Sequence, residues 1–260
     1  VRERLGANAA PIQIPIGIEH DLHGVVDLVK MKAYTYKGVE DNKLTESEIP
    51  SELVETAKKY RNELIESVAE YDDATLEKYL EGQELTEIDV KRAIRKGVVA
   101  VKFFPILGGD NRMATTQLLL DAVVEYLPAP SAVPAVTGDN PKTGETERRE
   151  PKNSEAFCAL AFKVVTDLHV GRLVYIRVYS GVIKAGQVVY NVAKQKEERV
   201  SKLVLLHADQ RELIEEAYAG EIVAVVGIKE TTTGNSITDP GHPILLESIS
   251  FPEPVISLAI

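Results

Sequence analysis

The hydrophobic period of this chain changes once along its length, and that change constrains the fold more than any other feature. Up to about residue 128, apolar residues recur three and four positions apart, as in Leu53, Ala57, Tyr60, Leu64 and Val68. Residues at that spacing lie on one face of a helix. After residue 151, short apolar runs follow one another with glycine-containing breaks between them. That pattern is typical of a small all-β barrel, so we expect an α/β (α+β) part followed by a β-barrel.

The first part combines strands with helices. Ile12, Ile14 and Ile16 alternate along one face of a strand that ends near Gly17, and residues 24–36 are rich in residues that favour strands. Thr86, with Asp89 three residues later, has the spacing of a capping box. A buried strand is expected over 98–107. Helices are expected over four segments, about 50–68, 74–81, 86–97 and 116–127.

The segment 128–151 separates the two parts. It holds five prolines together with glycine, asparagine and many charged residues. Such a composition predicts a linker followed by an exposed hairpin or loop. Strands of the barrel are then expected over six runs: 156–166, 173–179, 187–192, 198–207, 222–228 and 245–251.

Acidic residues are concentrated in one stretch. The net charge is −10, which argues against a general binder of polyanions. Between Leu44 and Arg92 there are 14 Asp/Glu and 6 Lys/Arg, which gives −8. Charged helices are commonly just solvated surfaces, but a localised field can also steer a basic partner onto a docking face. The sequence leaves both interpretations open.

Other global features exclude some classes of protein. No apolar run approaches the roughly 18 residues that a membrane helix needs. The start, Val1-Arg2-Glu3-Arg4, has neither an initiator Met nor the apolar stretch of a signal peptide, and it suggests a trimmed chain. The single cysteine, Cys158, fits a reducing compartment and lies in an apolar run, so we expect a small core residue rather than a nucleophile.

Nucleotide motifs are incomplete. There is no GxxxxGK[ST] loop, whose backbone N–H groups would hold phosphates. Asp21 to Gly24 has the DxxG spacing of GTPases, and Asn42-Lys43 resembles the start of a guanine-reading NKxD, but Thr45 stands where that motif has Asp. Because neither follows a phosphate loop, we expect neither to touch nucleotide. The chain by itself is therefore predicted not to bind or hydrolyse GTP.

No other catalytic or metal motif stands out. Glu19, His20, Asp21 and His23 offer ligand types, but a short loop with adjacent ligands suits tetrahedral coordination poorly, so we expect turn residues. The chain contains no GxSxG, no HExxH and no patterned Cys/His pair. From its residues alone it is predicted to be a binding or structural unit.

Several stretches nevertheless resemble elongation factor G, a translational GTPase. Residues 4–8 and 11–17 resemble the strand after its NKxD, 24–33 the opening of its G′ insertion, 78–87 the G′ helices, and 118–128 its last G-domain helix. Its domain II resembles 161–163, 167, 171–173, 177–181, 198–200, 224–227 and 233–234, and the start of its domain III resembles 252–256. The resemblance covers almost the whole chain in order.

This resemblance implies a domain plan. Residues 1–130 would be the C-terminal part of a G domain, with the G′ insertion at about 17–98. Residues 131–251 would be the domain II barrel, and 252–260 a linker into domain III. The P-loop, the switch regions and NKxD of the family would lie before Val1, and domains III to V after Ile260.

One segment departs from the family. Before its last G-domain helix the family carries a Ser-Ala-[Leu/Lys] element that helps to hold guanine, and 107–116 here contains no such triplet. Backbone N–H groups of Gly108, Gly109, Asp110 and Asn111 could still face a nucleotide. A smaller departure is Gly234-Asn235-Ser236, where the family has Gly-Asp-Thr.

The resemblance also implies function and partners. The complete protein would be a cytoplasmic, ribosome-dependent GTPase that uses GTP, GDP and Mg²⁺ and promotes movement of tRNA and mRNA through the ribosome. It would engage neither membrane nor DNA. The acidic G′ helices would meet the basic large-subunit stalk protein through Glu55, Glu63 and Glu66. The barrel would contact small-subunit rRNA through Lys194, Lys196, Arg199 and Lys202.

Two alternatives remain open. The departure at 107–116 suits a paralogue that binds ribosomes as a regulatory protein with an altered nucleotide site. A release-type or ribosome-protection-type translational GTPase would share the barrel, although the G′-like stretch argues against the tetracycline-protection group, which lacks such an insertion.

Overall fold

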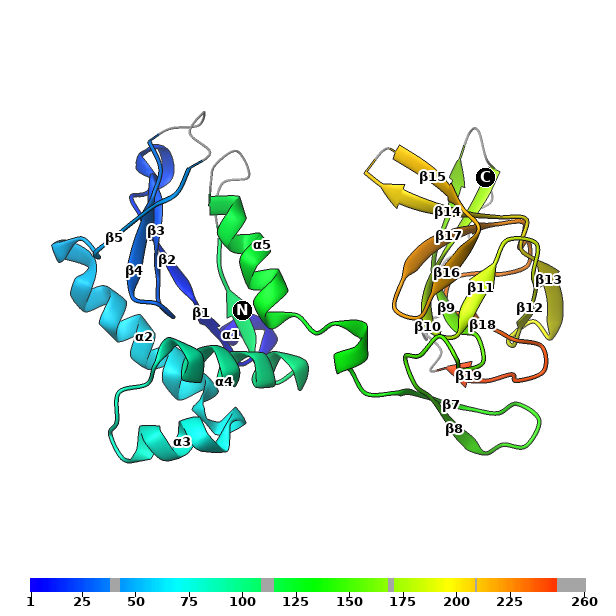
Figure 1. Ribbon diagram of the computed structural model, residues 1–260, viewed down its shortest axis with the longest axis horizontal. Helices are drawn as coiled ribbons and strands as arrows, with labels where there is room; N and C mark the ends of the chain where they lie inside the picture. The colour runs from blue at the N-terminus through cyan, green and yellow to red at the C-terminus, as the bar shows by residue number, and fades with distance from the viewer. Residues whose placement is uncertain (38–42, 109–114, 168–170, 209, 247–260) are drawn as a thin grey trace. The chain divides into compact units, whose positions relative to one another are not determined.

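The computed structural model describes residues 1–37, 43–108, 115–167, 171–208 and 210–246 (Figure 1). The chain forms two compact units, Val1–Pro128 and Ala129–Ile260. The first is mixed α/β and the second is almost entirely β. The predicted fold class, an α/β part followed by a barrel, is confirmed. The expected linker at 252–260 lies outside the described residues.

The first unit contains two sheets and a group of helices. β2 (Gln13–Ile16), β3 (Gly24–Asp27), β4 (Lys32–Thr35) and β5 (Thr45–Ser47) form an antiparallel sheet in that order. β1 (Ala9–Pro11) pairs in parallel with β6 (Phe104–Ile106). The helices are α1 (Arg2–Leu5), α2 (Val54–Val68), α3 (Asp73–Leu80), α4 (Glu87–Val99) and α5 (Thr115–Tyr126), with 3-10 turns at Glu19–Asp21, Ser51–Leu53 and Ala69–Tyr71.

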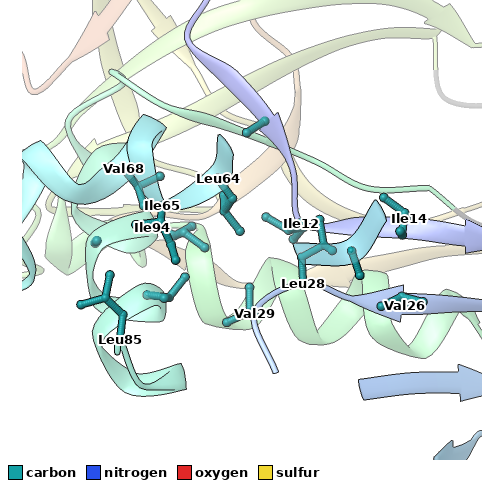
Figure 2. Close-up of a cluster of buried hydrophobic side chains, with 14 of the residues drawn as sticks. Ile12, Ile14, Val26, Leu28, Val29, Leu64, Ile65, Val68, Leu85 and Ile94 are labelled. Carbon is teal, nitrogen blue, oxygen red and sulfur yellow. The ribbon is translucent and has the colours of Figure 1, made fainter. Parts of the chain in front are cut away.

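One hydrophobic core joins these helices to the strands. Figure 2 shows Ile12 and Leu28 from the strand side lying toward Leu64 of α2, and Val26 and Ile94 belong to the same cluster. These side chains are buried because the apolar period of each strand and helix places them on one face. Burying a side chain of this size contributes about 1.5–3 kcal/mol, so this core holds α2 against β1 and α4 against β6.

The ends of α4 show where local signals suffice and where they do not. The predicted capping box is present, with Asp89 N donating to Thr86 Oγ1 (3.3 Å) and Thr86 N to Asp89 Oδ2 (3.1 Å). The end was predicted near Gly97, and the helix runs a little further, to Val99. Gly97 serves close packing instead: a Cβ there would lie 2.7 Å from the Tyr71 ring.

The buried strand predicted over 98–107 is largely wrong. Its first residues belong to α4, and the backbone then turns back, with Lys102 N and Phe103 N both donating to Gly97 O. The strand is only Phe104–Ile106. Phe103 is buried in the core, whereas Phe104 and Ile106 are about 40% exposed, because the sheet they belong to has so few strands.

The second unit begins with a hairpin. A 3-10 turn at Pro130–Ala132 precedes β7 (Val136–Asp139) and β8 (Thr146–Arg149), which pair antiparallel, and β19 (Leu245–Leu246) pairs with β7. The linker and hairpin expected at 128–151 are therefore found.

The barrel itself is one curled sheet, with strand order β13-β12-β18-β9-β10-β17-β14-β15. The strands are β9 (Cys158–Asp167), β10 (Gly171–Ser180), β12 (Val188–Asn191), β13 (Lys196–Arg199), β14 (Lys202–His207), β15 (Gln210–Ile214), β17 (Ile222–Val226) and β18 (Ser236–Thr238). β11 (Val182–Lys184) and β16 (Glu216–Tyr218) form a separate pair.

The link between β13 and β14 closes this sheet into a barrel. Val200 exchanges hydrogen bonds with the β12 side, donating to Gln187 O (2.9 Å) and accepting from Gly186 N (2.7 Å), while Ser201 N donates to Val226 O of β17 (2.7 Å). Alternate residues of β9, β10 and β17 fill the interior, among them Ala159, Ile176 and Val223. The expected run 198–207 is therefore two strands, because this bend changes the pairing partner.

Candidate functional site

A loop of the first unit occupies the position that binds ligands in many α/β proteins. β1 and β6 are parallel, and the segment beginning at Leu107 and Gly108 follows the carboxyl end of β6. Ligands in open α/β sheets bind outside the carboxyl ends of the strands. Gly108 is exposed, and a Cβ there would meet nothing within 4 Å. Gly109, Asp110 and Asn111 lie outside the described residues, so their predicted nucleotide contacts stay predictions.

Helix α5 of the first unit presents an apolar surface. On α5, Leu120 is 60% exposed and Val124 79% exposed, and Leu119 and Val123 are each more than 40% exposed. The parallel sheet of the first unit contains only β1 and β6 among the described residues. Parallel strands normally occur in larger sheets that are covered on both faces. A contiguous exposed apolar surface of this kind marks an interaction face.

The three predicted stalk-docking residues share one face of α2. At 100° per residue, Glu55, Glu63 and Glu66 fall within about 80° of the helix circumference. Glu55 and Glu66 are exposed, and Glu63 is half-buried with its carboxylate 4.0 Å from an Arg2 nitrogen. Lys58 pairs with Glu55 at 3.0 Å. The structure therefore places these three residues on one face of α2. Neighbouring cations partly neutralise their carboxylates.

Several cations of the 44–92 stretch already bind backbone carbonyls or buried carboxylates of the first unit. Arg61 donates to the backbone carbonyls of Leu28, Val29 and Leu85. Lys78 and Arg92 bind the buried carboxylates of Asp72 and Asp89. Most other acids in and around α2 and α3 are exposed, so the surface is negative overall, although Lys58 and Lys59 of α2 are exposed on it as well. The exposed acids are Glu52, Glu55, Glu66, Glu70, Asp73, Glu77, Glu81 and Glu84.

The four basic residues predicted to contact rRNA are all exposed, but they do not form one patch. Lys194 and Lys196 lie together at the β12–β13 turn, where Lys194 N donates to Asn191 Oδ1 (3.0 Å). Lys196 and Arg199 are three residues apart on β13, so their side chains leave opposite faces of the strand. Lys202 begins β14. Acidic neighbours Glu197 and Glu230 interrupt the basic surface.

A buried polar network supports that turn, and the sequence does not predict it. Asn191 Nδ2 donates to Thr231 Oγ1 (3.0 Å) and to Asn235 Oδ1 (3.1 Å), and Thr231 Oγ1 donates to Glu198 Oε2 (2.5 Å). Asn235 Oδ1 also accepts from Thr232 N (2.9 Å). The network fixes the loop at 229–235 beside Lys196. Its members are up to 44 positions apart, so no local pattern signals it.

Asn235 also explains the smaller departure from the family pattern. Its side-chain oxygen acts only as an acceptor in this network. A carboxylate could accept the same bonds, because Asp carries oxygens of similar placement. The Asn at this position is therefore compatible with the fold of the loop.

The candidate metal ligands lie in a turn and the single cysteine lies in the core, where the sequence places them. Glu19–Asp21 is a 3-10 turn between β2 and β3, and His23 Nδ1 lies 2.6 Å from Asp21 O. Among the described residues, no group of three or more His, Cys, Asp or Glu is arranged to hold a metal ion. Cys158 is buried, and burial raises the pKa of its thiol to about 12, which suits an inert core residue. Asn42, which begins the incomplete NKxD motif, lies outside the described residues.

In the part of the chain that the structure describes, no helix is both long and apolar enough to cross a membrane.

Two comparisons with known proteins bear on these sites. The family model for Elongation factor Tu domain 2 matches residues 171–238, from β10 to β18. The crystal structure of ttk003000868 from Thermus thermophilus matches 97% of this chain with 26% identity and a TM-score of 0.70. This chain spans 35% of that protein. The barrel therefore has the fold of a translation-factor domain.

Proposed function

We propose that this chain is part of an elongation factor of the elongation factor G type, whose complete form hydrolyses GTP and promotes tRNA–mRNA translocation on the ribosome. The match of residues 171–238 to Elongation factor Tu domain 2 carries this proposal. The order of an α/β unit followed by that barrel supports it. Hydrolysis would act as a switch by ordering and releasing loops. The chain itself supplies recognition rather than hydrolysis.

The exposed face of α5 supports the idea that a nucleotide-binding half completes the first unit. Leu120 and Val124 are too exposed for a helix whose apolar side is satisfied, and a two-stranded parallel sheet is too small to stand alone. Further parallel strands carrying a phosphate loop would extend this sheet and cover the exposed face of α5. GTP and Mg²⁺ would then be held mainly by that half.

The two described units would make different contacts. The barrel would lie against small-subunit rRNA, with Lys194 and Lys196 meeting phosphates, which position a protein without reading sequence. The acidic α2–α3 surface would meet the basic stalk protein of the large subunit, since opposite potentials steer association. Both contacts would locate the protein in the cytoplasm with the ribosome.

Co-sedimentation with ribosomes tests the proposal. The chain is expected to pellet with ribosomes at low salt and to be released as salt rises, because phosphate contacts displace counterions. Lys194→Glu combined with Lys196→Glu should lower the pelleted fraction severalfold. Lys142→Glu combined with Lys152→Glu changes the charge equally at two other exposed barrel lysines and should have little effect. Absence of pelleting, or an equal loss in both double variants, would contradict the proposed contact.

A second candidate function is favoured by one observation. Residues 107–116 lack the family's guanine-holding triplet, which suits a paralogue that binds ribosomes without normal guanine selectivity. Such a regulatory protein would pellet with ribosomes equally well but would not distinguish GDP from ADP. Nucleotide affinity of the complete protein therefore separates the two candidates.

A further inference from the structure

The strands β9, β10, β17, β14 and β15 lie side by side in the barrel (Figure 1), and they are apolar on both faces. Alternate residues, among them Val174 and Val223, point into the barrel and form its core. The residues between them form a separate cluster on the outer face, in which Leu173, Val204 and Ala224 are buried. An antiparallel sheet commonly has one apolar face and one solvated face, so the outer cluster needs an explanation beyond the folding of the barrel.

The strand register arranges the outer side chains in a row that crosses the strands. Tyr175 of β10 pairs with Ala224 of β17, and Ala224 pairs with Val204 of β14. Val204 pairs in turn with Leu213 of β15. At the β9 end, the ring of Phe162 lies against that of Tyr175, with ring centroids 6.2 Å apart. Because neighbouring strands are about 4.8 Å apart, this apolar band is about 19 Å long.

Both ends of the apolar band are exposed. Phe162 is 37% exposed and Leu213 66%, whereas Ala224 and Val204 in the middle are at most 2% exposed. Ile222, two residues before Ala224 on β17, points to the same face and is 52% exposed. Exposed apolar surface that continues from a buried cluster marks an interaction site. All of these residues belong to the second unit.

Cations accompany the band on the same face. Lys163 of β9 pairs with Tyr175, and its Nζ lies 5.9 Å from the centre of that ring. Lys202 of β14 lies one row to one side of the band, and Arg211 of β15 lies one row to the other side. All three cations are exposed. In the band and the two rows beside it, no paired position of the described strands is Asp or Glu, although the chain has a net charge of −10.

The chemistry of this face favours an acidic protein as its partner. A positive surface attracts a partner of opposite charge, which is either a protein rich in Asp and Glu or a nucleic acid. A nucleic acid would stack its bases on aromatic rings, but Leu213 and Ile222, the most exposed apolar side chains of the face, are aliphatic. Aliphatic side chains instead pack against the apolar stripe of a protein segment.

The length of the band fits a helix. At 1.5 Å per residue, about 19 Å corresponds to about 13 helical residues, which is close to the average helix length in globular proteins. We propose that this outer face binds an acidic amphipathic helix of a partner protein. The apolar stripe of that helix covers the band from Phe162 to Leu213. Its Asp and Glu residues lie against Lys163 and Lys202.

The test uses no ribosomes, because the helix contact does not rest on the proposed function. The probe is a fluorescein-labelled peptide of about 18 residues, long enough that frayed ends leave its central turns intact. Leucine recurs in it at every third and fourth position, and the other positions are Glu and Ala. Two control peptides are matched to it, one with the same residues in a permuted order that has no apolar stripe, and one with Lys in place of Glu.

Fluorescence anisotropy measures the affinity of each peptide for the 260-residue chain, and ¹⁵N amide shifts locate the contact. We expect the acidic peptide to bind saturably in the micromolar range, with shifts confined to β9, β10, β17, β14 and β15. Each control peptide should bind at least about tenfold more weakly, because it lacks either the apolar stripe or the complementary charge.

A substitution in the band tests its location. Leu213→Glu introduces an acid at an exposed position of the band and should weaken binding of the acidic peptide about tenfold or more. Val188→Glu makes the same kind of change on β12, where the side chain is 43% exposed, and should leave the affinity unchanged.

A charge reversal tests the cations and keeps the proposal open to refutation if Leu213→Glu alters the fold, which its amide spectrum would reveal. Lys163→Glu combined with Lys202→Glu should weaken binding severalfold at low salt, and the difference should shrink at about 500 mM salt. Lys142→Glu combined with Lys152→Glu, at two other exposed lysines of the barrel unit, should have little effect.

Each outcome decides the proposal. Saturable binding of the acidic peptide that is lost in Leu213→Glu supports it. Equal binding of the permuted peptide, or no saturable binding of the acidic one, overturns it. A uridine oligonucleotide that shifts the same amides at lower concentrations identifies RNA as the occupant and overturns it as well. Self-association of the chain that Leu213→Glu removes, measured by sedimentation equilibrium, identifies a second copy of the chain with the same consequence.

Discussion

The guanidinium of Arg92 on α4 donates from Nε to Oδ2 of Asp72, 2.7 Å away, at the beginning of α3. The same oxygen accepts from Thr75 N (3.1 Å) and from Thr75 Oγ1 (2.6 Å), and Lys96 reaches the other oxygen (2.5 Å). One carboxylate, 3% exposed, thus caps α3 and ties it to α4. Of these two helices, α3 belongs to the acidic α2–α3 surface proposed to bind the stalk protein.

This network predicts a pH dependence of stability. Burial raises the pKa of Asp72, but hydrogen bonds from Lys96, Thr75 and Arg92 outweigh it and hold the pKa well below its usual range. Hydrogen bonds from Lys78 and Thr86 hold the pKa of Asp89 low as well. The folded pKa values lie below the unfolded value of about 3.9, so the stabilisation is complete above that pH and is lost as the pH falls below it.

Hydrogen exchange measures this effect locally. Amides of α3 and α4 should exchange progressively faster from about pH 4 down to about pH 2, after correction for intrinsic rates. In Asp72→Asn the helices should be less stable by about 2 kcal/mol at about pH 7, with a flatter pH dependence. Protection of α3 that is independent of pH in the wild type would contradict this account.

Gly97, the one glycine of α4, is predicted to tolerate no larger side chain. A Cβ would lie 2.7 Å from Tyr71 Cδ2 and 2.8 Å from Phe103 Cβ. Overpacking of this kind costs about 1–3 kcal/mol, which exceeds the gain of about 0.5–1 kcal/mol from replacing a helical glycine. Gly97→Ala should therefore lower the urea midpoint. Gly108→Ala, where a Cβ meets nothing within 4 Å, is the control, and equal midpoints for both variants would refute the packing argument.

The loop beside the β12–β13 turn should depend on the acceptor at position 235. Asn235→Ala leaves Thr232 N without its side-chain acceptor and removes one of the two acceptors of Asn191 Nδ2, at a cost of about 2 kcal/mol. Asn235→Asp keeps an acceptor oxygen and should lose less stability than Asn235→Ala. Exchange rates of residues 229–235 and the thermal midpoint report the difference. A larger loss of stability in the Asp variant than in the Ala variant would show that the side-chain oxygen at position 235 does not determine the stability of this loop.

The acidic face of α2 should control docking to the stalk protein. Replacing Glu55, Glu63 and Glu66 by Lys reverses three charges within one sector of the helix. The association rate measured at about 50 mM salt should fall about tenfold or more, and the difference should shrink at about 500 mM because salt screens exposed charges. Reversal of Glu145, Glu212 and Glu221, which are exposed on the barrel unit, gives a charge-matched control. Unchanged binding of the α2 variant at low salt would exclude this face.

Features encoded by neighbouring residues could be predicted from the sequence, and features that depend on distant contacts could not. The capping box at Thr86 and Asp89 needs only a three-residue spacing. The end of α4 could not be located, because Gly97 is fixed by Tyr71 and Phe103 from other segments. The network of Asn191 and Asn235 likewise arises only when β12 and the loop before β18 meet.

The residues of the candidate sites also differ in whether local spacing in the sequence predicts their grouping. The acidic face of α2 follows from helical spacing, so Glu55 and Glu66 can be grouped from sequence. Grouping the basic residues by nearness in sequence fails, because strand alternation separates Lys196 from Arg199.

Guanine-nucleotide binding by the complete protein tests the central claim most directly. Calorimetry with GDP, and with ADP as the control, would be carried out on the longer protein to which this chain is proposed to belong. The account predicts saturable binding of GDP with a Mg²⁺-dependent affinity and no heat with ADP. A folded protein that binds neither nucleotide, or binds both equally, would contradict the GTPase assignment.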